Sequence, residues 1–178
     1  CLILGEIISP LKLRNKNMYE KSLIIIKPDG VQRGLVGNII TRFENAGLKI
    51  HGMKFVQPTQ EMARAHYSEH VDKGFYPTVE EYILSGPVLV FALGGINSVK
   101  KIRLMVGATE PASSAPGTIR GDFAHQSYPA PGEPDDKPIR NLIHASGSSE
   151  EALTEVKLWF NDDEIIEYGK ITDELLAF

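Results

Sequence analysis

Short apolar runs punctuate the chain and predict the strands of a buried sheet. Residues 22–26 are mostly β-branched and end at Lys27-Pro28-Asp29-Gly30, so we expect a strand that stops in a loop there. Residues 87–93 form a second run, and residues 139–144 form a shorter one. Residues 48–56 alternate loosely between apolar and polar positions, as a half-buried strand does. The pattern therefore predicts four strands.

Between these runs, apolar residues recur at helical spacing and indicate helices. The first helix ends at Gly47, a residue type that often terminates helices, and the second begins after Thr59, a suitable N-cap. The second and third helices follow each other closely enough to form a helical hairpin. The predicted helices cover residues 36–46, 60–67, 77–84, 97–105 and 149–160.

Segments rich in Gly, Pro and small polar residues are predicted to be loops. Residues 107–122 form one, and residues 128–137 form an exposed, Pro-rich excursion. The resulting order of elements contains a βαββαβ core. This order predicts an α+β fold of the ferredoxin-like kind, with an antiparallel four-stranded sheet and surrounding helices.

Length and charge favour one domain without an overall attraction to nucleic acid or membranes. The chain has 178 residues, of which 19 are basic and 23 acidic, giving a formal charge of −4. A nucleic-acid-binding module on such a sheet would need exposed aromatic residues and a basic face, so this class is disfavoured. The single cysteine, Cys1, cannot form an internal disulfide and favours a reducing, cytoplasmic setting.

Residues 1–17 differ in character from the rest. An apolar stretch comes first and a basic run second, which is the wrong order for a signal peptide, and the stretch is too short to span a bilayer. We therefore expect Met18 to be the natural start, residues 1–17 to be an N-terminal extension outside the fold, and residues 18–178 to form the single domain. A mature lipoprotein cysteine at Cys1 is the alternative.

Four sequence blocks point to chemistry on phosphates. They are KPDGVQRGLVG at residues 27–37, HYSEH with GFYP at residues 66–77, GATEPASSAPGTIRGDF at residues 107–123, and NLIHAS at residues 141–146. Together they resemble the nucleoside diphosphate kinase family over residues 19–159. The resemblance implies a phosphotransferase that moves the γ-phosphate of a nucleoside triphosphate to a nucleoside diphosphate, in ping-pong fashion, through a phosphohistidine at His144.

His144 is the candidate nucleophile, because a neutral imidazole can attack phosphorus. Glu155, eleven residues later on the next predicted helix, is spaced to hydrogen-bond the ring and orient it. The resemblance implies this pair, with Ser146 supporting the site and Tyr67 as a nearby donor. Taken alone, a histidine at a strand end is more often structural, and a helix carboxylate is more often only solvated.

Phosphoryl transfer needs positive charge around the phosphate oxygens. Lys27 offers a compact charge, and Arg103 and Arg120 offer planar donors that suit phosphate. Thr109 adds a hydroxyl group, and by resemblance Asn141 contacts the sugar or the phosphate. Surface solvation is the alternative for each cation taken singly.

The resemblance also implies how the base is held. Phe75 and Val79 would sandwich it between an aromatic and an aliphatic side chain, which tolerates any base; core packing is their ordinary alternative. Mg²⁺ is the expected cofactor, carried by the nucleotide phosphates rather than by protein ligands. The expected partners are ATP and other nucleoside tri- and diphosphates, and copies of the chain in a hexamer or tetramer with residues 107–121 at the contacts.

The chain departs from the family pattern in three places. Gly147 stands where the family has Asp, Gly94 stands where many members carry an acidic residue, and the Pro-rich excursion is longer than usual. The missing carboxylate at position 147 removes a cap for the last helix, for which Ser148 or Ser149 is the expected replacement. The alternative function is therefore a nucleotide-binding regulatory relative with weakened turnover.

Overall fold

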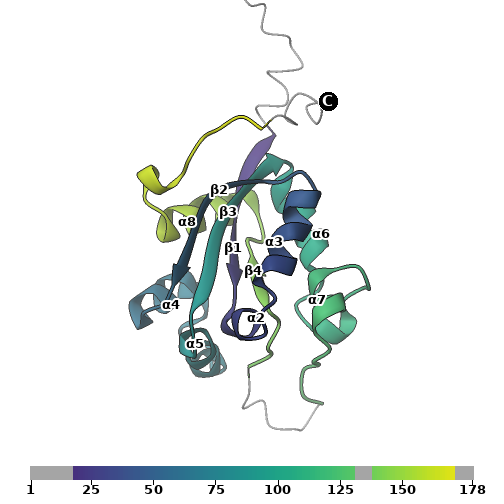
Figure 1. Cartoon of the computed structure of the whole chain (residues 1–178). Coiled ribbons are helices and arrows are strands. Elements are labelled where there is room, and N and C mark those ends of the chain that lie inside the picture. The colour runs from purple at the N-terminus through teal and green to yellow at the C-terminus, as the bar shows by residue number, and fades with distance from the viewer. Residues whose placement is uncertain (1–17, 131–137, 171–178) are drawn as a thin grey trace, which may run out of the picture.

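Four strands form one antiparallel sheet at the centre of the molecule (Figure 1). The computed structural model describes residues 18–130 and 138–170. The strands are β1 (Tyr19–Ile26), β2 (Lys49–Val56), β3 (Val88–Ile96) and β4 (Ile143–Ala145). They lie in the order β2-β3-β1-β4, and β1 pairs antiparallel with both β3 and β4. This sheet, with its helices, confirms the predicted α+β fold class.

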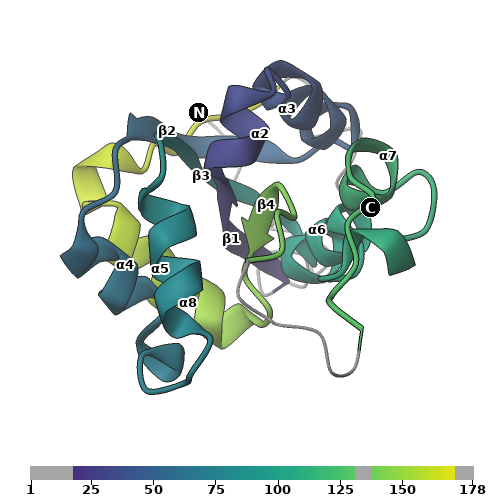
Figure 2. The same ribbon diagram turned by 90° about the horizontal axis from the view of Figure 1, so that it is seen from below.

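Helices cover both faces of the sheet (Figure 2). One side carries α3 (Val36–Asn45), α6 (Ser98–Val106) and α7 (Ile119–Phe123), and the other carries α4 (Gln60–His66), α5 (Tyr76–Leu84) and α8 (Ser149–Trp159). A short helix, α2 (Pro28–Gln32), follows β1, and the 3-10 turns are η1 (Ser68–His70), η2 (Pro111–Ser113) and η3 (Asp162–Glu164). Among the described helices, none combines the length and apolar character needed to cross a membrane.

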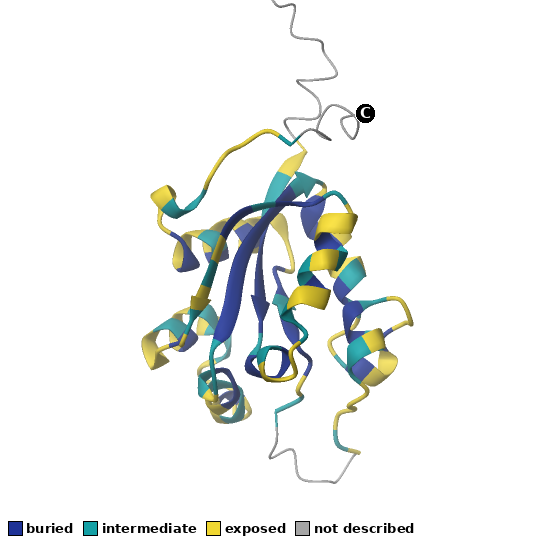
Figure 3. Ribbon diagram, in the orientation of Figure 1, coloured by how far each residue is buried: buried dark blue, intermediate teal, exposed yellow. Residues whose placement is uncertain are grey.

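Two separate apolar clusters explain why β1 is apolar along most of its length. Side chains alternate between the faces of a strand, so Ile24 and Ile26 enter the cluster beneath α3 and α6. Leu23 and Ile25 enter the cluster beneath α4, α5 and α8. Because helices cover both faces, the central strands are buried and the exposed residues lie mostly on the outer helices and loops (Figure 3).

The signals that end and begin helices act as predicted. Gly47 adopts a φ of +83° after α3, a conformation that costs glycine little. Thr59 caps α4 by accepting a hydrogen bond from the backbone of Met62. Ser148 caps α8 in the same way, so it replaces the carboxylate that position 147 lacks.

Three local predictions differ from the structure. Residues 28–32 form helix α2 rather than the expected loop, because Pro28 stands at the first helical position, where its fixed φ is favourable. The expected loop at residues 107–122 includes η2 and the start of α7. The last strand is confined to Ile143–Ala145, since Leu142 has a φ of +68° that no regular strand accommodates. Most of the Pro-rich excursion, residues 131–137, lies outside the described residues.

A buried histidine accounts for Gly94. The pairing of β2 with β3 shifts register between Ile50 and Gly52, at His51. The His51 ring lies between the Tyr19 hydroxyl, 2.7 Å from Nε2, and the carbonyl of Ile166, 3.0 Å from Nδ1. A Cβ atom at position 94 would lie 2.4 Å from His51 Nε2. Only glycine fits there beside this histidine.

Candidate active site

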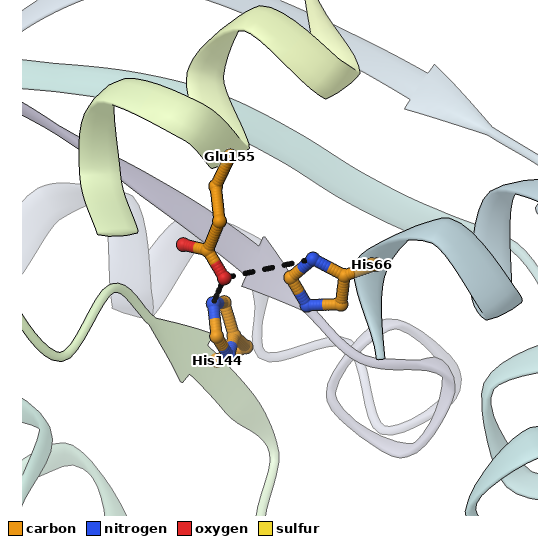
Figure 4. A group of neighbouring side chains, drawn as sticks. All are labelled: His66, His144 and Glu155. Atoms are coloured by element: carbon orange, nitrogen blue, oxygen red, sulfur yellow. Dashed lines mark ion pairs between the residues drawn. The ribbon is translucent and has the colours of Figure 1, made fainter. Parts of the chain in front are cut away.

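Three polar side chains from different elements meet beside the sheet (Figure 4). His144 comes from β4, Glu155 from α8 and His66 from the end of α4. Glu155 Oε1 lies 2.8 Å from His144 Nε2 and 3.6 Å from His66 Nδ1. The 2.8 Å contact is short, but its angle at His144 Nε2 does not suit a hydrogen bond, so it is a close contact between charge and ring. The site therefore holds a carboxylate between two imidazoles.

Ser146 fixes the carboxylate from its other side. The Ser146 hydroxyl donates to Glu155 Oε2 at 2.6 Å and accepts from the backbone N–H of Leu23 at 3.0 Å. The backbone N–H of Ser146 also donates to the Leu23 carbonyl, at 3.2 Å. The segment after β4 is thus tied to β1, and Glu155 is left with one oxygen facing the two histidine rings.

His66 is a site residue that the sequence analysis did not single out. Its ring meets that of His144 edge to face, with the centroids 4.5 Å apart. The indole N–H of Trp159 donates to His66 Nδ1 at 3.3 Å, which places the imidazole proton on Nε2. Its position next to Tyr67 in the HYSEH block is the sequence signal that marks it. The Tyr67 ring lies 4.6 Å from that of His66.

Burial keeps both imidazoles neutral. It lowers the pKa of His144 to about 3, and the positive charge of Lys27 adds to this effect. Burial also lowers the pKa of His66 to about 3, with His144 as the next cause. The loss of water raises the pKa of Tyr67, so its hydroxyl stays protonated. At neutral pH the site presents a neutral, nucleophilic imidazole at His144.

Lys27 stands where β1 ends, on the other side of His144. Its ammonium group donates to Asn141 Oδ1 at 2.8 Å, and the Asn141 amide donates to the carbonyl of Thr109 at 2.9 Å. Burial, together with the charge of Arg120, lowers the pKa of Lys27 to about 8. The structure thus brings four predicted residues into one network, with Lys27 still mostly charged at neutral pH.

The two predicted arginines occupy different environments. Arg120 is buried, and its guanidinium donates to the backbone carbonyls of Gly107, Ala108, Asn141 and Ile143. Burial lowers the pKa of Arg120 to about 10, which still leaves it charged. Arg103 is exposed on α6 and donates to the carbonyl of Ala145 at 3.3 Å. Arg120 therefore organises backbone around His144, while Arg103 keeps more of its donors available.

The hairpin of α4 and α5 carries the predicted base contacts. Phe75 is the N-cap of α5, and 44% of its surface is exposed. Val79 lies one helical turn later and is partly buried. Residues four apart lie on the same face of a helix, so the two side chains share one side of α5. A separate cavity of about 570 Å³ lies between α4 and α8 and reaches Tyr67, His144 and Glu155.

Among the described residues, His66, His144 and Glu155 form the one group with spacing suited to a metal, with ligand atoms within 4.8 Å of one another. The charges of Lys27, Arg103 and Arg120 all lower the pKa of His144, which means that they oppose a positive charge on its ring. They would oppose a bound cation there for the same reason. The electrostatics therefore suit an incoming phosphate better than a metal ion.

Comparisons of the sequence point to one family. The sequence profile described as "Nucleoside diphosphate kinase" matches residues 20–165. The chain is 47% identical over 158 residues to the nucleoside diphosphate kinase of Pyrococcus abyssi, covering 89% of this chain and 94% of that protein. It is 49% identical over 148 residues to nucleoside diphosphate kinase A1 of Xenopus laevis, covering 83% and 89%.

Solved structures agree with the sequence. The chain superimposes with a TM-score of 0.82 and 36% identity on the nucleoside-diphosphate kinase of Borrelia burgdorferi with bound vanadate and ADP, covering 88% of this chain and 96% of that one. The halophilic enzyme of Halobacterium salinarum in complex with CDP gives a TM-score of 0.79 and 38% identity, covering 88% and 97%. The resemblance read from the four sequence blocks is therefore confirmed, and the chain belongs to the nucleoside diphosphate kinase family.

Proposed function

We propose that His144 carries the phosphate between nucleotides in this nucleoside diphosphate kinase. The observation that supports it most is the short contact between His144 Nε2 and Glu155 Oε1. The negative charge of Glu155 lies close to Nε2 and favours the tautomer with the proton on Nε2, which leaves Nδ1 the lone pair that attacks phosphorus. The lowered pKa of His144 adds support, because the ring is neutral at the pH of the reaction.

In the first half-reaction, Nδ1 of His144 forms a bond to the γ-phosphorus while the bond from that phosphorus to the β-phosphate oxygen breaks. The nucleoside diphosphate then leaves. The phosphorylated ring, protonated at Nε2, gains positive character, which the carboxylate of Glu155 stabilises. In the second half-reaction an oxygen of the acceptor diphosphate attacks the same phosphorus, and the N–P bond breaks.

Lys27, Arg103 and Arg120 supply positive charge where negative charge develops on the transferring group. Arg120 acts largely by holding the backbone around Asn141, and Arg103 reaches the phosphate as a donor. Tyr67 donates a hydrogen bond beside the nucleophile. Asn141, held by Lys27, contacts the sugar or phosphate with Thr109.

The nucleotide base stacks between Phe75 and Val79, a contact that distinguishes little between bases. The donor set around the phosphates consists of cations and amides, and the nearby carboxylate, Glu155, is already hydrogen-bonded by Ser146. These residues fit a nucleotide that brings Mg²⁺ on its own phosphates. When bound there, the ion neutralises phosphate charge. The relatives solved with ADP and with CDP support nucleotides as ligands.

Assembly into a hexamer or tetramer is part of the same proposal, with residues 107–121 at the contacts. Sedimentation velocity of the purified chain distinguishes these two states from a monomer.

The test is a two-step labelling experiment. Purified protein is incubated with Mg²⁺ and γ-labelled ATP and then chased with GDP, beside His144→Ala. We expect acid-labile, base-stable label on the wild type alone and its transfer to GDP. Absence of label from the wild type contradicts the relay, and label that GDP never removes indicates a regulatory relative.

A further inference from the structure

Leu142 has an unusual backbone conformation two residues before His144. Its φ is +68°, and its side chain is fully buried. In this left-handed region the Cβ atom of a leucine crowds its own backbone, so the residue stays there only where its surroundings hold it. Leu142 separates Asn141 from the strand that carries His144. Its conformation therefore sets the relative direction of two residues of the site.

Both polar backbone groups of Leu142 are held by the segment after β1. The Leu142 N–H donates to Asp29 Oδ2 at 3.2 Å, and the Leu142 carbonyl accepts from the N–H of Lys27 at 2.8 Å. A Cβ atom on residue 30 would lie 3.1 Å from the Leu142 carbonyl oxygen and 2.8 Å from a methyl group of Ile26, so this approach requires Gly30. Lys27 and Asp29 thus hydrogen-bond to the backbone of Leu142, and Gly30 leaves room for its close approach.

The second oxygen of Asp29 is fixed as well. The Tyr82 hydroxyl donates to Asp29 Oδ1 at 2.5 Å, and both residues are 5% exposed. The ring of Tyr82 also lies under the ammonium group of Lys27, which is 5.5 Å from the ring centroid. Because Tyr82 belongs to α5, the Asp29 carboxylate joins the helix that carries Val79 to the strand that carries His144.

We propose that Asp29 is a positioning residue for phosphate transfer: its carboxylate holds Leu142 in the left-handed conformation and so places Asn141 and His144 relative to Lys27. This inference rests on the proposed role of His144. Asp29 touches neither the nucleophile nor the phosphate; it acts through the backbone of Leu142.

The test compares Asp29→Ala with Asp29→Asn. Alanine removes the acceptor, so the rate of His144 phosphorylation by γ-labelled ATP falls about 10²-fold, with little change in KM for the nucleotide. Asparagine keeps an oxygen for the Leu142 N–H, and its amide group can donate to the Tyr82 hydroxyl oxygen. It therefore recovers the rate to within roughly fivefold of wild type. The comparison is made at pH 6, because the charge of Asp29 helps to raise the pKa of Lys27 and its loss should move the alkaline decline to lower pH.

The rates are measured on protein that circular dichroism shows to be folded, because a purely structural role would lower the melting temperature without slowing the folded enzyme. Wild type and His144→Ala are labelled first; a wild type without label is a failure of the proposed function, not of Asp29. A folded Asp29→Ala with the wild-type rate overturns the inference. So does an Asp29→Asn as slow as Asp29→Ala, since charge would then matter more than geometry.

Tyr82→Phe keeps the inference testable even if Asp29→Ala does not fold. It removes one anchor of the carboxylate and leaves the bond to Leu142. We expect phosphorylation to slow roughly three- to tenfold, an intermediate effect. A rate equal to that of wild type contradicts the inference.

Discussion

The two sides of His144 are built differently. On one side, the Glu155 carboxylate lies 2.8 Å from the His144 ring, 2.6 Å from the Ser146 hydroxyl and 3.6 Å from the His66 ring. On the other side, Lys27 and Arg120 bring charge and are held mainly by backbone carbonyls and an amide. Burial on all sides and charge from the second side combine to lower the pKa of His144. In the proposed function, the first side orients the ring and the second binds the phosphate.

This difference means that substitutions on the two sides should change different kinetic constants. Loss of charge on the cationic side should weaken both substrate capture and the transition state, because the phosphate is charged in both. Loss of orientation on the carboxylate side should slow the chemical step while leaving nucleotide affinity nearly intact.

Replacement of Lys27 tests the cationic side. We expect Lys27→Met to lower kcat/KM about 10²- to 10³-fold, the usual cost of one lost charge donor. In the wild type, kcat/KM should also decline above about pH 8, because the pKa of Lys27 is lowered to about 8 and the charge is lost beyond it. The measurement is steady-state kcat/KM from pH 6 to 10. Lys27→Arg should remove the alkaline decline.

Lys21→Met is the matched control, since Lys21 lies on β1, which ends just before Lys27, but pairs with Glu167 at the surface. Its kcat/KM should equal that of wild type. An alkaline decline that persists unchanged in Lys27→Arg contradicts the assignment to Lys27.

Replacement of Glu155 tests the carboxylate side. In Glu155→Gln, an amide N–H₂ facing His144 favours the imidazole with its proton on Nδ1, which removes the attacking lone pair. We expect kcat to fall roughly 10- to 100-fold, with KM for ADP within about threefold of wild type. Steady-state kinetics measure both constants. The exposed Glu150→Gln on the same helix is the control, and an effect confined to KM would count against an orienting role.

The fold could be predicted from the sequence because local patterns and tertiary packing agree. Continuous apolar runs marked the strands covered on both faces, and Thr59 and Gly47 marked helix ends that the structure retains. The predictions failed at α2, where Pro28 starts a helix instead of a loop, and at Leu142, where distant contacts hold the backbone. Asp29 holds Leu142 across more than a hundred residues of sequence, and no local pattern contains that contact.

The sequence predicted some residues of the site and missed others. The sequence blocks identified His144 and Lys27, and the structure brings them close together, but their catalytic roles stay predictions. The sequence did not reveal that Arg120 donates most of its hydrogen bonds to backbone carbonyls, because a motif does not show whether a side chain is buried. It also did not single out His66, whose contact with Trp159 joins two helices far apart in sequence.

An effect on stability instead of catalysis appears on the carboxylate side in acid. Burial lowers the pKa of His66 to about 3, whereas an unfolded chain binds this proton near pH 6.5. The contribution of His66 to the free energy of unfolding is therefore complete above pH 6.5. It falls by about 1.4 kcal/mol per pH unit as the pH drops toward 3. His66→Asn should remove that part of the slope. Urea unfolding between pH 7 and 4 measures it, with the exposed His125→Asn as control.

The smallest effect concerns Gly147, which lies between β4 and α8. Glu151 Oε2 accepts from the Gly147 N–H at 2.6 Å, and a Cβ atom at position 147 would lie 2.6 Å from the same oxygen. Gly147→Asp should therefore displace Glu151 and lower the free energy of unfolding by about 1 kcal/mol. Gly147→Asp combined with Glu151→Ser should recover it, because one carboxylate then replaces the other. Urea unfolding measures both; a single variant as stable as wild type, or more stable, would show that the contact between Glu151 and the Gly147 N–H contributes little to stability.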